Sequence, residues 1–75
     1  MTRQEFLTAL REMLQCDMEI REDTVLTELE EWDSLAFMVL IAFFDKNFGQ
    51  RITFDNLKTC HMPSDLIALS AGGIS

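Results

Sequence analysis

The sequence has few of the residues on which disulfide, metal and catalytic sites depend. It contains two cysteines, one histidine, one proline and no tyrosine, and six basic residues against thirteen acidic ones. Two cysteines are too few for a disulfide framework, and the neighbours Cys60 and His61 do not supply the three or four ligands that a zinc site needs. We therefore expect no metal site. Cys16 and Cys60 should be reduced thiols that behave as small buried or half-buried apolar residues.

Long apolar runs and secretory signals are also missing. No stretch reaches the roughly 18 consecutive apolar residues of a transmembrane helix. The first helical pattern is not preceded by the basic region, apolar region and cleavage site of a secretory signal peptide. The net charge of −7 disfavours nucleic acid as a partner and favours a basic protein. We expect a cytoplasmic monomer without a membrane span.

The length of the chain limits the function further. A chain of 75 residues forms one small domain, residues 1–75, with a single core. Such a core leaves little room for a substrate cavity, so the sequence favours a protein that is not itself an enzyme.

Apolar periodicity predicts helices and no strand. Thr2 to Glu5 form a capping-box pattern, so a helix should begin at about Arg3. Its core face should consist of Phe6, Leu7, Leu10, Met13 and Leu14. A second helix should begin at about Ser34 and end at Phe48, where Gly49 supplies a stop signal.

Two shorter helical segments are predicted after Gly49. A short helical turn should cover residues 55–59, and Pro63 suits the first position of a last helix whose apolar face holds Leu66, Ile67 and Leu69. The end of that helix should fray at residues 71–73. The predicted fold is thus all-α, a small four-helix bundle with a long acidic loop between helices 1 and 2 and a short third helix.

The predicted loop carries most of the negative charge. Residues 17–33 contain one basic residue, Arg21, and eight of the thirteen acids, namely Asp17, Glu19, Glu22, Asp23, Glu28, Glu30, Glu31 and Asp33. We expect Ile20, Leu26 and Leu29 to hold this loop against the bundle.

The second helix is apolar on two sides. At 100° per residue, one stripe faces the core and consists of Phe37, Leu40, Ile41, Phe44 and Phe48. The opposite stripe consists of Leu35, Met38, Val39 and Ala42. A small bundle does not easily cover both stripes, so the second should meet a partner. The alternatives are that neighbouring segments cover it or that it closes a homodimer.

Ser34 lies at the start of this helix, between the acidic loop and the apolar run. A serine is a weak nucleophile without an adjacent base, and the single histidine, His61, is far away in sequence. The glycines of a G-x-S-x-G turn are also absent. A hydrolase would need His61 within hydrogen-bond reach of Ser34. On the local pattern alone, Ser34 could be a helix-capping residue.

A wider pattern resembles an acyl carrier protein. It consists of Leu26-x-x-Leu29-x-x-Trp32-Asp33-Ser34-Leu35, a helix ending in Phe48-Gly49, and Pro63-Ser64-Asp65-Leu66-Ile67-Ala68-Leu69. The resemblance spans nearly the whole chain. In that family a separate phosphopantetheinyl transferase attaches 4'-phosphopantetheine to the motif serine, and the terminal thiol carries an acyl or aminoacyl thioester. The resemblance implies that Ser34 is the attachment site, with Asp33 and Leu35 beside it.

The resemblance also implies a docking surface around Ser34. Glu30 and Glu31 would steer basic partners, and the second apolar stripe, Leu35, Met38, Val39 and Ala42, would contact them. Typical carriers of fatty acid synthesis have several outward acids on the second helix. Here Ala36, Val39 and Lys46 should occupy the solvent side, with Asp45 as the only acid.

This departure favours a dedicated partner in a specialised biosynthetic pathway. Such a partner would be an acyl- or aminoacyl-activating ligase, or an acyltransferase, with a basic and apolar docking surface. The alternative is a small acidic interaction module of the same helical shape, in which Ser34 is only a helix cap.

Overall fold

The computed structural model describes all 75 residues, which form four α-helices and one 3₁₀ turn without any strand. The elements in chain order are α1 (Arg3–Leu14), the 3₁₀ turn η1 (Leu26–Glu28), α2 (Ser34–Phe48), α3 (Phe54–Lys58) and α4 (Pro63–Leu69). The predicted small helical bundle with a short third helix is confirmed, and α3 begins one residue earlier than expected. None of the helices has the length and apolar character needed to cross a bilayer.

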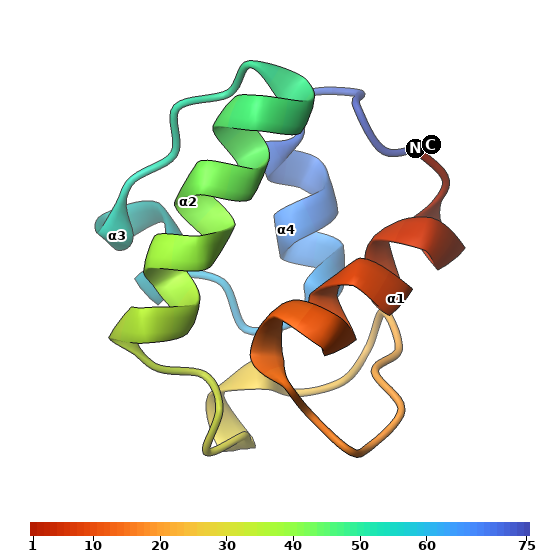
Figure 1. Cartoon of the computed structure of the whole chain (residues 1–75), viewed down its shortest axis with the longest axis vertical. Helices are drawn as coiled ribbons and strands as arrows, with labels where there is room; N and C mark the ends of the chain where they lie inside the picture. The colour runs from red at the N-terminus through yellow and green to blue at the C-terminus, as the bar shows by residue number, and fades with distance from the viewer.

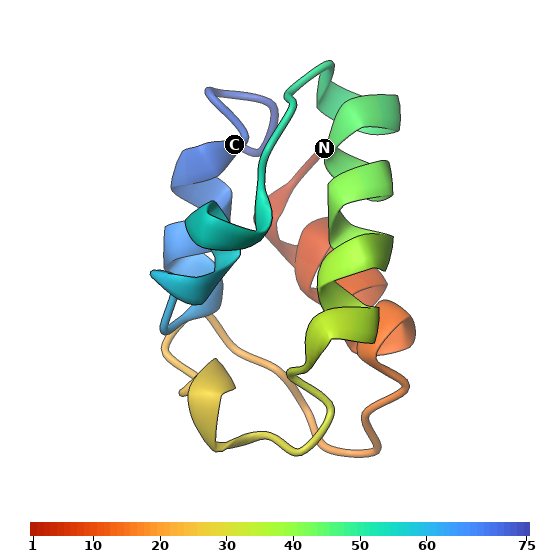
Figure 2. The same cartoon turned by 90° about the vertical axis from the view of Figure 1, so that its left-hand side faces the viewer.

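Two helices, α2 and α4, lie one behind the other, and the other two helices flank them. Figures 1 and 2 show α2 in front of α4, while α1 and α3 lie on opposite sides of α2. The acidic loop closes the end of the molecule where α2 begins, and both chain termini lie near the opposite end (Figure 1). The arrangement therefore places Ser34 and most of the negative charge at one end of the bundle.

The core lies between α1, α2 and α4 and is rich in phenylalanine. Phe6 of α1 and Phe44 of α2 are fully buried, with ring centroids 6.0 Å apart in an edge-to-face arrangement. Such pairs stabilise a core beyond the area that they bury. The predicted core face of α1 is confirmed at Phe6, Leu10 and Leu14, whereas Leu7 and Met13 are half-buried at its edge.

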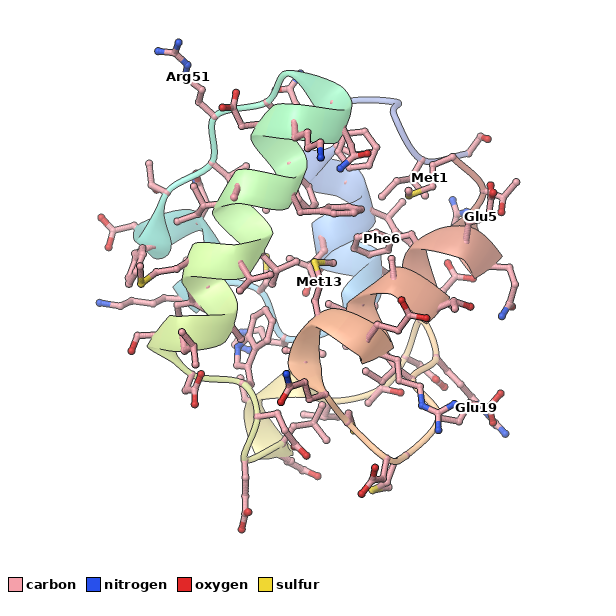
Figure 3. All side chains as sticks on the ribbon, in the orientation of Figure 1. Met1, Glu5, Phe6, Met13, Glu19 and Arg51 are labelled. Carbon is pink, nitrogen blue, oxygen red and sulfur yellow. The ribbon has the colours of Figure 1, made fainter.

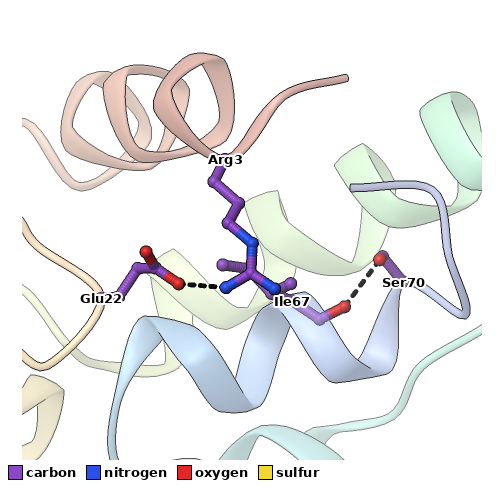
Figure 4. A network of polar contacts seen from close by, with 4 residues as sticks. All are labelled: Arg3, Glu22, Ile67 and Ser70. Carbon is purple, nitrogen blue, oxygen red and sulfur yellow. Dashed lines mark hydrogen bonds and ion pairs between the residues drawn. The ribbon is translucent and has the colours of Figure 1, made fainter. Parts of the chain in front are cut away.

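The acidic loop is fixed to the bundle, as its apolar residues predict. Ile20 and Leu26 are buried and Leu29 is half-buried. The Leu26 amide donates to the carbonyl of His61 at 2.7 Å, and the side chain of Arg3 pairs with Glu22 across the gap to α1 (Figure 4). A loop tied down in this way positions the residues that lead into α2.

The predicted fraying after α4 is wrong, because the last residues pack against the bundle. Ile74 is 5 % exposed, and the hydroxyl of Ser70 donates to the carbonyl of Ile67 at 2.6 Å (Figure 4) while accepting from the Ile74 amide. A Cβ on Gly73 would lie 2.4 Å from a ring carbon of Phe48. The glycine that suggested a frayed end instead permits this close approach.

Carboxylates accept hydrogen bonds from backbone amides at the starts of two helices. The carboxylate of Asp65 accepts hydrogen bonds from the amides of His61 and Met62, at 2.9 and 3.1 Å, and these bonds hold the pKa of Asp65 below its usual value. Bonds from Thr2 likewise lower the pKa of Glu5 in the confirmed capping box of α1. Met62 offers no side-chain oxygen to the first turn of α4, so the side-chain bonds at this helix start are those that Asp65 accepts from the two preceding amides.

We predict that the free energy of unfolding falls as the pH drops from about 5 to about 3, through the usual carboxyl range. The folded state binds these protons more weakly than the unfolded state, so the stabilisation exists above the unfolded pKa and is lost through the folded pKa. Urea unfolding at pH 6 and at pH 3 measures this fall in the free energy of unfolding. Asp65→Asn should lose less of it between the two pH values than the parent protein does. An equal loss in the variant and the parent would show that the hydrogen bonds of Asp65 do not contribute to the pH dependence of stability.

Candidate functional site

Ser34 occupies the first turn of α2 and is exposed. The N-cap is Asp33, whose Oδ1 accepts from the Ala36 amide at 3.1 Å. The interpretation of Ser34 as the capping residue is therefore wrong, because an acidic side chain one position earlier already satisfies that amide. No hydrogen bond joins the hydroxyl of the exposed Ser34 to the rest of the protein.

An aromatic contact fixes the direction in which the chain enters α2. The ring of Trp32, one position before the cap, packs edge-to-face on Phe37 with centroids 4.9 Å apart. Phe37 also packs on Phe54 of α3 at 5.8 Å. An apolar residue before the cap that contacts the fourth helical residue is a hydrophobic staple. The spacing of Trp32 and Phe37 in the sequence predicts this staple, although it was not among the expectations above.

The first two amides of α2 have no hydrogen-bond partner within the protein. Helices leave their first amides without intrahelical partners, and here Asp33 satisfies the amides of Ala36 and Phe37 through its side chain and its carbonyl. The amides of Ser34 and Leu35 are left for solvent or a ligand. An anionic group on Ser34 would thus lie near two free donors and the positive end of the helix dipole.

The second apolar stripe of α2 is exposed as predicted, and the core stripe is buried except at Ile41 and Phe48, which are half-buried. Leu35 is 70 % and Met38 60 % exposed, and Val39 and Ala42 are also at the surface, whereas Phe37, Leu40 and Phe44 are buried. Neither the loop nor a neighbouring helix covers the second stripe. One expectation is wrong: Ala36 is buried, not at the solvent side, and it faces the end of α1 across a groove. Asp45 and Lys46 are exposed as expected.

A groove of about 300 Å³ lies beside Ser34, between the end of α1 and the start of α2. Figure 3 shows the side chain of Met13 between these two helices. The chain leaves α1 at Gln15, which adopts a left-handed conformation with φ 54°. The groove is lined by Met13, Leu14, Gln15, Glu31, Asp33, Leu35, Ala36 and Val39. The sequence did not predict it, because it depends on how the two helices meet.

The acids near the groove are not neutralised within the protein. The two ion pairs of the structure are Arg3 with Glu22 and Arg21 with Glu19, both in the first part of the loop. Glu30 is exposed and Glu31 is half-buried at the groove. The end of the bundle that holds Ser34 therefore carries carboxylates without an ion-pair partner.

Other nucleophilic and metal-binding groups do not gather at this site. Cys60 is buried, its thiol lies 3.3 Å from the carbonyl of Asn56, and burial raises its pKa to about 11. Cys16 is also buried. His61 does not hydrogen bond to Ser34, and no three potential metal ligands form a group. The thiols and the imidazole therefore lie apart from the Ser34 hydroxyl.

Comparison with known proteins found no matching family model, curated protein or solved structure. The functional assignment therefore depends on the site itself.

Proposed function

We propose that this chain is a discrete acyl carrier protein that carries acyl or aminoacyl groups on a 4'-phosphopantetheine arm attached to Ser34. The observation that carries the proposal is the exposed Ser34 hydroxyl in the first turn of α2, with helix capping performed by Asp33. The chain itself would not be an enzyme. When bound, the arm supplies a terminal thiol that holds the cargo as a thioester.

The start of α2 suits the phosphodiester that would link the arm to the protein. The helix dipole and the free amides of Ser34 and Leu35 favour a negative charge there by a few tenths to about 1 kcal/mol. Asp33 and Leu35 would fix the backbone on either side of the attachment point. The fold is thus compatible with both the unmodified and the modified serine.

The surroundings of Ser34 suit transient docking. Glu30 and Glu31 would attract basic partner surfaces over a distance set by salt, and the exposed stripe of Leu35, Met38, Val39 and Ala42 would form the close contact. The partners would be a phosphopantetheinyl transferase and a ligase or acyltransferase of a specialised pathway.

The alternative function, a small acidic interaction module, would use the same exposed stripe. In that alternative the accessible hydroxyl of Ser34 has no role, because Asp33 already caps α2. The carrier proposal accounts for both features.

The thiols of the protein provide a direct test. At pH 8, a thiol with the pKa of Cys60, about 11, is ionised to only about 0.1 %, and both cysteines are buried. We predict that the native protein shows no fast-reacting thiol towards a disulfide reagent, and that incubation with coenzyme A and a phosphopantetheinyl transferase adds one. An unchanged thiol count after incubation with several transferases would contradict the proposal.

Charge and apolar contact should affect phosphopantetheine transfer differently. Neutralising Glu30 and Glu31 together should lower kcat/KM by about tenfold at low salt, where steering acts, and have little effect at about 1 M salt. Met38→Glu should weaken transfer at every salt concentration, because it disrupts close contact rather than long-range attraction. Steady-state rates across a salt series measure both effects. A folded Met38→Glu variant that reacts like the parent would remove Met38 from the docking surface.

A further inference from the structure

The accessible sulfur atoms of this protein belong to methionines, not to cysteines. Cys16 and Cys60 are both buried, and burial raises the pKa of the Cys60 thiol to about 11. Oxidation of a cysteine requires an accessible thiolate, so neither thiol is a suitable target. Met18 and Met38 are 67 % and 60 % exposed, and a thioether is oxidised without losing a proton. Peroxide should therefore react with these two thioethers before it reacts with either thiol.

Met38 lies one helical turn after Ser34 on the same face of α2. Residues four apart in a helix have Cβ atoms about 5–6 Å apart, and helical side chains lean towards the N-terminus. The Met38 side chain is thus a surface neighbour of Ser34, between the exposed Leu35 and Ala42 of the same stripe. Met18, by contrast, lies in the acidic loop outside the stripe. Oxidation of Met38 alone would change the surface next to Ser34.

Oxidation would make this part of the apolar stripe polar. Hydrogen peroxide transfers one oxygen atom to the sulfur, its O–O bond breaks, and the second oxygen leaves as water. The thioether loses two electrons in this step and becomes a sulfoxide, a polar group in place of a flexible apolar one. Burial of such a group against a partner without a hydrogen bond is unfavourable. A sulfoxide at Met38 would therefore oppose close contact on the stripe.

We propose that Met38 is a reversible oxidation site that controls the access of partner enzymes to Ser34. The thioether permits docking on the stripe, and the sulfoxide prevents it until methionine sulfoxide reductases restore the thioether. In that reduction a dithiol supplies two electrons and two protons and becomes a disulfide, and the oxygen atom leaves as water. The control of docking rests on the proposed function, because it requires an enzyme that acts on Ser34.

The first measurement maps oxidation without any partner. The protein without the arm is treated with graded hydrogen peroxide, and peptide mass spectrometry gives the sulfoxide fraction at each methionine. Met18 and Met38 should be oxidised at least about fivefold faster than the half-buried Met13, which lies between α1 and α2 (Figure 3). Both thiols should remain unoxidised. Circular dichroism should show unchanged helix content, because both exposed side chains lie outside the core.

The second measurement is the initial rate of phosphopantetheine transfer to the same samples after removal of the peroxide. Oxidation of the parent should lower kcat/KM by about fivefold or more, and treatment with the two reductases, one for each sulfoxide epimer, should restore it. Met38→Leu keeps an apolar side chain of similar volume without sulfur. Its transfer should begin near the parent rate and stay there after peroxide. Met18→Leu is the matched control and should lose activity with peroxide as the parent does.

Equal oxidation rates at Met13 and Met38, or oxidation of a thiol before Met38, would overturn the proposal. Sensitivity to peroxide that persists in Met38→Leu, or that disappears in Met18→Leu, would also overturn it. Failure of the carrier function is a separate outcome, because no transferase would then modify even the untreated parent. Transfer at equal rates to the untreated parent and to protein with the sulfoxide at Met38 would instead uphold the carrier function and remove the control by oxidation.

Discussion

Phe44→Ala is expected to remove a large share of the stability of the chain. Phe44 is fully buried, and its ring packs against Phe6 at 6.0 Å and Phe48 at 5.2 Å. Truncation of a buried phenylalanine costs about 3–5 kcal/mol, because it removes apolar burial and leaves a cavity. At roughly 0.05–0.15 kcal/mol per residue, a chain of 75 residues has a total stability of about 4–11 kcal/mol. Circular dichroism during urea unfolding measures the loss.

Val39→Ala is the matched control on the opposite side of the same helix. Val39 is 39 % exposed, so truncation removes little buried surface, and alanine is a better helix former than valine. The urea midpoint of this variant should stay close to that of the parent. Equal destabilisation by the two substitutions would contradict the assignment of the core and exposed faces of α2.

Ser34→Ala is expected to abolish phosphopantetheine transfer completely. The substitution removes the one oxygen to which the arm would be attached, while Asp33 still caps the helix through the Ala36 amide. Helix content and stability should therefore be unchanged. The effect on transfer is total because the variant lacks the acceptor atom, so no partial activity should remain at any enzyme concentration.

Ser64→Ala is the control for this prediction. Ser64 lies in the first turn of α4, so it is also a serine near a helix start, but it follows Pro63 and is half-buried. This variant should accept the arm like the parent protein. Loss of transfer in Ser64→Ala, or its persistence in Ser34→Ala, would place the acceptor elsewhere in the chain.

The helices could be predicted because their signals are local. The Thr2 and Glu5 capping box, Gly49 in its left-handed conformation and Pro63 at a helix start each act within a few residues. The two faces of α2 follow from helical periodicity in the same way. The loop residues Ile20 and Leu26 are buried as predicted, because burial of apolar side chains against the core is favourable wherever a loop places them next to it.

The remaining features depend on contacts between segments far apart in sequence. Ala36 is buried on the side of α2 that faces the end of α1, and Ile74 is buried where Gly73 lets the tail approach Phe48. Neither packing partner can be identified from the local pattern. The groove beside Ser34 has the same origin, since α1 supplies one wall and α2 the other.

The sequence left open which of two neighbouring residues caps α2. Asp33 and Ser34 are both good capping residues, and the sequence alone does not state which of them adopts the extended conformation before the first turn. The structure places Asp33 there, with φ −136° and ψ −175°. That single choice releases the Ser34 hydroxyl, on which the proposed function depends.

The most direct test of the carrier function is the intact mass of the protein after incubation with coenzyme A, Mg²⁺ and a broad-specificity phosphopantetheinyl transferase. We predict that the parent protein gains the mass of one phosphopantetheinyl group and that fragmentation places it on Ser34. An unchanged mass with every transferase tried, in protein shown to be folded, would contradict the proposed function.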